Sequence, residues 1–209
     1  MTGAKQRCLH TREGFSLLEI LIVVALFAMA SIILAQVFLS FSRLHRKISN
    51  QVVLSQDMRF AMELLVREAR NKTVQYTDPA TGLPITYALG GTVASSSEMH
   101  LTGTNDTTDV EVTNDQTICG DVAGINCLAL SKDRGTSWYP ITSKHVNVQM
   151  FGAYVRPTVS PFDQSSGSYP NNIQPMVTLN LSLQYVAQNP QDNTTLQAQT
   201  SVSSRIYQR

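Results

Sequence analysis

A nearly unbroken apolar stretch at positions 15–41 constrains what this chain can fold into more than any other feature. Only Glu19, Gln36 and three serines interrupt it. As a helix with a rise of 1.5 Å per residue it would reach about 40 Å, enough to cross a hydrocarbon core of about 30 Å. A soluble domain of this size could not bury such a helix on all sides, so the stretch predicts a membrane span.

Glu19 is the one charged residue inside this stretch. A charged side chain costs about 2.5–3.5 kcal/mol at the centre of a membrane helix on insertion scales, and less near the interface. We therefore interpret Glu19 as a residue that has a partner. The alternative is an interfacial carboxylate that reaches water by snorkelling and has no partner.

The charges before the apolar stretch differ from those after it. Lys5, Arg7 and Arg12 stand against Glu13 in a basic leader, whereas the whole chain has a formal net charge of only +1. No basic stripe with interleaved aromatic residues is present in the sequence, so nucleic acid is not an expected partner. The remainder is rich in Ser, Thr, Asn and Gln, which favours an extracytoplasmic β-rich domain over a cytosolic enzyme.

The helical pattern continues past the apolar stretch, because no Gly or Pro occurs between Phe15 and Asp78. From position 44, apolar residues recur at steps of mostly three or four and predict one face of an amphipathic helix. The predicted face consists of Leu44, Ile48, Val52, Met58, Ala61, Met62, Leu65 and Ala69. Phe60 and Leu64 lie off this face, and they indicate either a broader core or contact with a neighbouring subunit.

Charged residues are interleaved with that face up to the end of the helix. Glu63 and Arg67 have the spacing of a favourable i,i+4 ion pair. The helix should end near Lys72 or Thr73, before the turn signals around Pro79.

After position 84 the apolar period changes from that of a helix to that of a strand. Short strands are predicted at residues 85–89, 98–102, 110–113, 128–130, 146–154 and 177–185. The last of these alternates strictly between apolar and polar residues, as a half-buried strand does. A polar turn at 188–193 separates it from a final strand around 196–206, and the two should form an antiparallel hairpin. The stretch at 156–175 is interpreted as an exposed insertion.

These elements predict an α+β fold with one long N-terminal helix, over about 15–72. Its C-terminal half should pack on an antiparallel sheet, and its apolar half should protrude. The chain then divides into a leader at 1–14, a transmembrane half-helix at 15–41, an amphipathic half-helix at 42–73 and a β-rich domain at 74–209.

Three cysteines are present, and two of them have the spacing of a short disulfide loop. Cys8 lies in the leader, whereas Cys119 and Cys127 bracket a turn-prone segment. A disulfide there would contribute about 2–3 kcal/mol in an oxidising compartment on the loop-entropy model. The alternative is two unpaired thiols in a reducing cell. The spacing fits no zinc pattern, so no metal and no cofactor is expected.

No nucleophile, base and orienting residue can be grouped from the sequence, so catalysis is not expected. His100 and His145 alternate with apolar neighbours and should face solvent in strands. Four aspartates form an acidic stretch whose spacing fits no known calcium motif: Asp106, Asp109, Asp115 and Asp121. The long loops and the single tryptophan, Trp138, leave room for partner binding.

Two ordinary explanations of the N-terminal stretch can be weighed from the residues alone. A secretory signal would be cleaved before Ser31, but it would contain Glu19 and would leave an apolar segment at the new N-terminus. An uncleaved anchor would hold a domain with a binding or catalytic task of its own. Basic residues flank the span on both sides, so the positive-inside rule gives no clear orientation.

A third explanation rests on the sequence Arg12-Glu13-Gly14-Phe15-Ser16-Leu17-Leu18-Glu19-Ile20. It resembles the class III signal of type IV pilins and of type II secretion pseudopilins. That family pattern is a basic leader ending in Gly, an aromatic residue, Glu at the fifth mature position and about twenty apolar residues. The resemblance implies cleavage between Gly14 and Phe15 and N-methylation of Phe15 by a prepilin peptidase.

The resemblance also implies where the protein resides and what it contacts. The chain would be a single-pass inner-membrane protein, with lipid around its helix and an extracytoplasmic C-terminal domain. It would then enter a helical fibre through an inner-membrane assembly platform and contact other pilin or pseudopilin subunits. Cleavage would leave an amine on Phe15 that can pair with Glu19 of the same chain or of a neighbour, and only the second pairing specifies register.

A looser resemblance covers residues 55–70 and the closing strand. Both are similar to minor pilins of the J/W type, which implies a minor subunit acting in fibre assembly or initiation. Residues 77–190 resemble no family. The apolar stretch lacks the helix-breaking Pro or Gly of many major pilins, so local melting of the helix is not expected here. Whether the fibre serves motility, adhesion, DNA uptake or secretion is open at this point.

Overall fold

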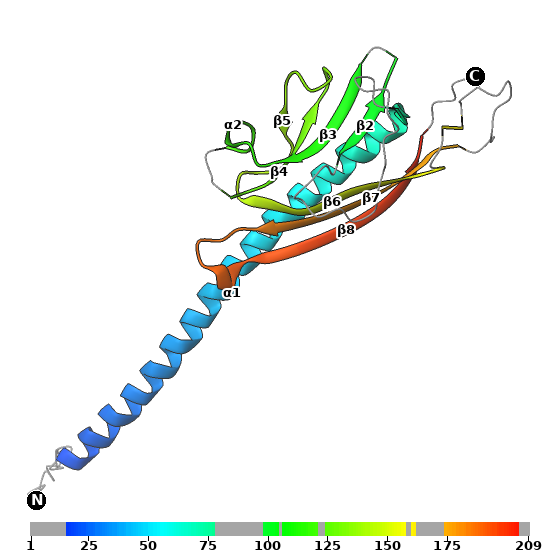
Figure 1. The fold of residues 1–209 in the computed structure, drawn as a ribbon. Coiled ribbons are helices and arrows are strands. Elements are labelled where there is room, and N and C mark those ends of the chain that lie inside the picture. The colour runs from blue at the N-terminus through cyan, green and yellow to red at the C-terminus, as the bar shows by residue number, and fades with distance from the viewer. Residues whose placement is uncertain are drawn as a thin grey trace, which may run out of the picture. The chain divides into compact units, whose positions relative to one another are not determined.

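The computed structural model describes residues 16–77, 98–104, 106–120, 124–157, 160–161 and 174–204 (Figure 1). The chain divides into two compact units, Met1–His45 and Arg46–Arg209. Gly14 and Phe15, the predicted processing residues, lie outside the described residues, as do the strand predicted at 85–89 and most of the insertion at 156–175.

The long N-terminal helix is confirmed as α1, which runs without interruption over Leu17–Asn71. It begins after Ser16, whose carbonyl and hydroxyl oxygens both accept a hydrogen bond from the backbone N–H of Glu19, at 3.0 and 3.2 Å. The helix ends one residue before the predicted boundary at Lys72. The sequence pattern therefore located this element to within about two residues at each end.

In the first unit, every residue of α1 from 17 to 41 is exposed. Phe27 and Phe38 expose 74% and 70% of their surface. Within the described part of the chain, α1 is the one helix whose length and apolar composition would allow it to cross a bilayer.

In the second unit, α1 packs on the sheets through a row of buried residues: Leu54, Met58, Ala61, Leu65 and Ala69. This corrects the predicted apolar face at its N-terminal end. Leu44, Ile48 and Val52 expose 56%, 51% and 50% of their surface. At 3.6 residues per turn, Val52 lies about 160° around the helix from Leu54, so the two cannot share one face. Leu44, Ile48 and Val52, spaced by four residues, therefore lie on a different side of the helix from the residues that pack in the core.

The first sheet has five strands in the order β1-β2-β3-β4-β5, all antiparallel. Their bounds are Thr73–Val74, Met99–Thr102, Thr107–Thr113, Cys127–Ser131 and Tyr139–Pro140. The predictions at 98–102, 110–113 and 128–130 correspond to β2, β3 and β4. The two-residue strands β1 and β5 are too short to leave a period in the sequence, and both were missed. The short helix α2 (Gln116–Cys119) precedes β4.

The second sheet has three antiparallel strands, β6 (Val146–Arg156), β7 (Met176–Tyr185) and β8 (Thr194–Ser203). The predicted hairpin is confirmed, with Leu181 opposite Ala198 and Val177 opposite Val202. A 3-10 turn, η1 (Pro190–Asp192), joins its strands. The prediction named a single sheet, whereas the structure has two. The described β4 and β6 form no ladder with each other, and the hydrogen bonds at the junction run from Asn126, just before β4, to Asn147 and Val148 of β6.

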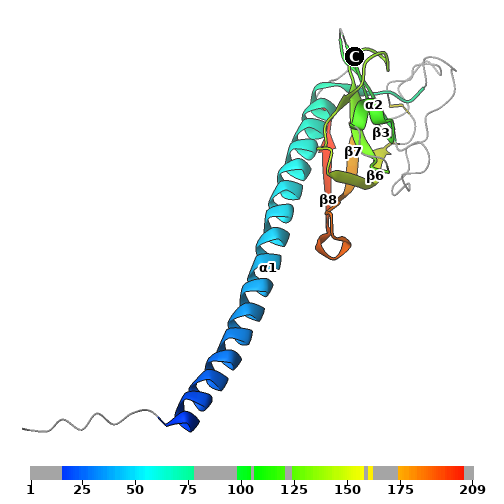
Figure 2. The same cartoon turned by 90° about the vertical axis from the view of Figure 1, so that its left-hand side faces the viewer.

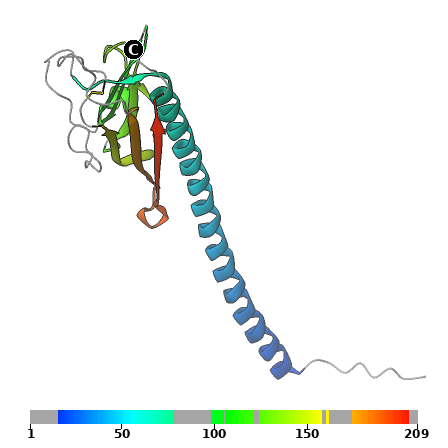
Figure 3. The same ribbon diagram turned by 90° about the vertical axis from the view of Figure 1, so that its right-hand side faces the viewer.

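The C-terminal part of α1 and both sheets share one hydrophobic core. Met99 and Leu101 enter it from the first sheet, and Phe151 and Leu181 enter it from the second. Figures 2 and 3 show β6, β7 and β8 beside this part of α1.

Polar contacts also fix α1 to two turns at one end of the second sheet, where β6 begins and where β7 leads into β8. Asp57 accepts hydrogen bonds from the backbone N–H of Ser143, at 2.8 Å, and from the Ser143 hydroxyl. Arg46 and Asn50 approach Asp192 in the turn between β7 and β8, at 3.9 and 3.5 Å. The amphipathic half of the helix is therefore held by both apolar and polar contacts.

Candidate functional site

Glu19 lies in the first turn of α1, where the structure gives it a local role that the sequence analysis missed. Ser16 caps the helix through its hydroxyl, and a glutamate three residues after such a cap is typical of a capping box. The carboxylate also lies at the positive end of the helix dipole. The Ser-x-x-Glu spacing of Ser16 and Glu19 in the sequence could have predicted this cap. Glu19 takes part in none of the ion pairs found among the described residues.

A buried polar cluster closes the other end of α1. The Lys72 ammonium lies 2.6 Å from Asp106 Oδ2 and 3.3 Å from Glu68 Oε2, and it donates to the Thr108 hydroxyl. Thr108 donates to Glu68 at 3.2 Å. Lys72 and Glu68 expose only 5% and 7% of their surface. Glu68 is one of the charged residues interleaved with the predicted apolar face, and the structure buries it beside the core.

The predicted Glu63–Arg67 ion pair is not formed. Arg67 Nη2 instead lies 3.7 Å from Glu68 Oε1, at the edge of the buried cluster. Arg67 approaches Glu68 instead of Glu63 because Glu68 is held in place by Lys72 and Thr108, whereas Glu63 is exposed.

A second polar cluster lies on the outward side of β2 and β3. His100 Nδ1 is 2.7 Å from Asp109 Oδ1, and His100 Nε2 is 3.2 Å from Glu98 Oε2. The hydrogen bond with Asp109 is the main cause that raises the pKa of His100 above its usual value of 6.5. Burial, followed by the nearby Glu98, raises the pKa of Glu111.

His100 differs from its predicted exposure, whereas His145 is exposed as predicted but does not lie in a strand. The His100 side chain is only 27% exposed and is bound by carboxylates, instead of facing solvent freely. His145 is exposed, but it lies in the turn before β6, with its ring centre 6.2 Å from that of Tyr185.

A cleft of about 730 Å³ opens on this side of the sheet. We call it the acidic cleft, and its chemically distinctive lining residues are Glu98, His100, Asp109, Glu111, Arg134 and Trp138. Trp138 closes one side beside Gly135, which has a φ of +77° that favours glycine. Three carboxylates and Arg134 line the cleft, and His100 binds two of these carboxylates, Glu98 and Asp109. Glu111 is therefore the carboxylate left for a cationic group that also stacks on the indole ring.

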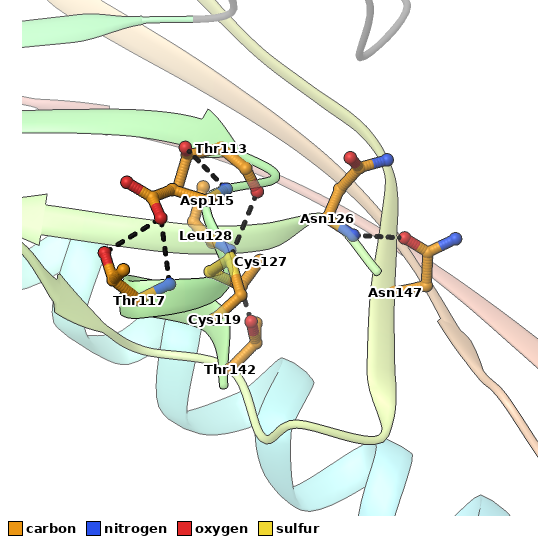
Figure 4. The surroundings of a disulfide bond; sticks show 9 residues. All are labelled: Thr113, Asp115, Thr117, Cys119, Asn126, Cys127, Leu128, Thr142 and Asn147. Atoms are coloured by element: carbon orange, nitrogen blue, oxygen red, sulfur yellow. Dashed lines mark hydrogen bonds between the residues drawn. A yellow bond between two sulfur atoms is a disulfide. The ribbon is translucent and has the colours of Figure 1, made fainter. Parts of the chain in front are cut away.

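Cys119 and Cys127 form a disulfide, with Cα atoms 5.4 Å apart, which joins the end of α2 to the start of β4 (Figure 4). The loop that it closes also connects the two sheets. Asn126 donates its N–H to Asn147 Oδ1 at 2.8 Å, and its carbonyl accepts from Val148 N at 2.8 Å.

The described aspartates of the predicted acidic stretch each have a different structural role. Asp106 binds Lys72, Asp109 binds His100, and Asp115 caps α2 by accepting from Thr117 N at 2.8 Å. The hydrogen bonds from Thr117 lower the pKa of Asp115. Asp121 lies outside the described residues. Among the residues that the structure describes, no group of three or more His, Cys, Asp or Glu side chains is arranged to hold a metal ion.

Comparison with family models, curated proteins and solved structures found no match to this chain. The geometry supports an α+β protein with one long apolar N-terminal helix and a disulfide. These features are compatible with a single membrane span and with an oxidising compartment around the β-rich part.

Proposed function

We propose that this chain is a subunit of a type IV pilus or of a type II secretion pseudopilus. It is a minor subunit of the J/W type that acts in fibre assembly or initiation. The observation that carries the proposal is the position of Glu19, four residues after the expected new N-terminus at Phe15 and at the start of an exposed apolar helix.

The exposed side chains of residues 17–41 require a covering other than water. Lipid covers them while the helix spans the inner membrane, and the helices of neighbouring subunits replace the lipid in a fibre. An unpaired carboxylate is costly in both settings. The amine that cleavage creates on Phe15 of a neighbouring chain neutralises Glu19, and it does so only in the correct axial register.

The proposal is tested by following the chain from the membrane into fibres in its native host. Surface filaments, or the pseudopilus formed on overproduction of its major subunit, should contain the processed chain as a minor component. Gly14→Ala should block processing and leave the longer precursor in the inner membrane. A processed chain that never co-purifies with filaments, together with intact fibre formation in its absence, would refute the proposed function.

The acidic cleft favours one alternative, an uncleaved anchor that presents a binding domain. In that case the cleft binds its ligand whether or not residues 1–14 are present, and the substitution of Gly14 has no effect. The two candidates therefore differ in their dependence on the N-terminal cut.

A further inference from the structure

The outward side of α1 in the second unit is basic. Between Arg46 and Asn71 its exposed charged side chains are five cations and one anion: Arg46, Lys47, Arg59, Arg67, Arg70 and Glu63. Arg46 and Arg67 have acidic neighbours at 3.9 and 3.7 Å. Arg59 has no ion pair among the described residues, and it is exposed.

Arg59 borders a shallow groove of about 300 Å³ on this side of the helix. We call it the helix groove, and it is lined by Ile48, Gln51, Val52, Ser55, Gln56 and Arg59. The neighbouring Phe60 is 57% exposed. At 1.5 Å per residue, Arg59 follows Phe41 by about 27 Å along α1, so a bilayer around residues 17–41 does not reach it. Water or protein, and not lipid, is therefore its surrounding.

The acidic cleft has the complementary chemistry. Asp109 is paired with His100, whereas Glu111 has no ion pair among the described residues. Trp138 provides an aromatic ring beside the carboxylates. A guanidinium can bind a carboxylate by charge-assisted hydrogen bonds and stack on an indole ring at the same time.

The helix groove and the acidic cleft lie on opposite sides of the second unit. The inward residues of β2 and β3, such as Met99 and Val110, enter the core that α1 closes from the other side. His100, Asp109 and Glu111 alternate with them and face away from that core. One copy therefore cannot satisfy both surfaces by itself, but two copies can.

We propose that the acidic cleft of one copy receives Arg59 and the adjoining helix groove of a second copy. Different surfaces meet in this contact, so it is heterologous and leaves a free cleft at one end and a free groove at the other. The inference goes beyond the proposed function, because it requires two copies in one membrane but not a cut at Gly14. Failure of either proposal leaves the other intact.

The test uses the full chain in vesicles of zwitterionic lipid, with donor and acceptor dyes at the C-terminus and energy transfer as the readout. Arg59→Glu and Glu111→Arg should each weaken self-association by about tenfold or more. Energy transfer should return when the two variants are mixed, because the first keeps an unaltered cleft and the second keeps an unaltered groove. Lys144→Glu, an exposed position outside both surfaces, is the control with the same charge change as Arg59→Glu and should associate as the wild type does.

Near-ultraviolet circular dichroism and an intact Cys119–Cys127 disulfide show that each variant is folded. Wild-type association of Arg59→Glu, or the absence of energy transfer between the two folded variants, would overturn the inference. If a charge reversal prevents folding, Arg59→Gln and Glu111→Gln decide the matter. Weaker association of both supports the contact, and wild-type association of either contradicts it.

Discussion

Glu19 has one role at the start of α1 and, in our proposal, a second role in pairing with a neighbouring chain. Its backbone N–H is bound by Ser16, and its carboxylate lies where a helix N-terminus favours negative charge. Both contributions operate within one chain and would be present in any helix that starts here. The proposed pairing with the Phe15 amine of a neighbour is additional and acts between chains. Substitutions at Ser16 and Glu19 separate the two.

Glu19→Ala should leave membrane insertion and processing intact but reduce incorporation into fibres by about tenfold or more. Loss of the partner for the neighbouring amine is the reason, since an unpaired charge in an apolar core is strongly disfavoured. Immunoblots of the membrane and fibre fractions measure both steps. Ser16→Ala is the matched control, because it removes the cap but keeps the carboxylate, and it should be incorporated. Equal incorporation of Glu19→Ala and the wild type would remove the intersubunit role.

His100 makes stability depend on pH. Its pKa is raised in the folded state, mainly by Asp109, so folding favours its protonated form. This contribution is fully present below the unfolded pKa of about 6.5 and is lost as the pH rises through the higher folded value. His100→Gln should therefore lower the unfolding midpoint in denaturant at pH 6 and have less effect at pH 8. A difference from the wild type that grows between pH 6 and pH 8 would contradict this.

At the scale of elements, the end of α1 depends on a buried ion pair. Lys72→Met leaves Glu68 buried without its cation, and the expected loss is about 3–5 kcal/mol of unfolding free energy. Arg70→Met changes the same charge on the exposed side of the helix and should cost less than about 0.5 kcal/mol. Denaturant unfolding of the two variants compares them directly. Equal stabilities would show that the cluster contributes little.

The disulfide is a second element-scale constraint. Replacing both Cys119 and Cys127 by Ser should lower the unfolding free energy by about 2–3 kcal/mol, from the entropy of the short loop. The effect should extend to β6, because Asn126 in that loop bonds Asn147 and Val148. Hydrogen exchange at Val148 N–H reports it. Unchanged protection there would mean that the junction between the sheets does not need the disulfide.

Strong periodic patterns made most elements predictable. The long helix and the hairpin of β7 and β8 were predictable because many residues repeat one period in each. The split into two sheets was not predictable, because the junction depends on two hydrogen bonds between Asn126, just before β4, and β6. The burial of Glu68 and Lys72 could not be predicted from the sequence either, since their partners lie on β3 and in the turn before it, far along the chain. The acidic cleft brings together β2, β3 and the loop before β5, and no local motif encodes that meeting.

At the scale of the whole molecule, we propose different partners for two kinds of surface. The apolar residues at 17–41 require lipid or other apolar helices, and the membrane and then the proposed fibre would provide these in succession. The helix groove and the acidic cleft carry complementary charged groups, which the proposed contact between two copies would bring together. The two units of the chain thus carry two separate contacts, and the proposed subunit would use the first to enter a fibre and the second to meet another copy.

Mass spectrometry of the N-terminus of the mature protein, isolated from wild-type cells of its native host, tests the central claim most directly. The account predicts a chain that begins at Phe15 and carries one methyl group on its amine. A chain that retains residues 1–14, or one that begins at Ser31, would contradict the account.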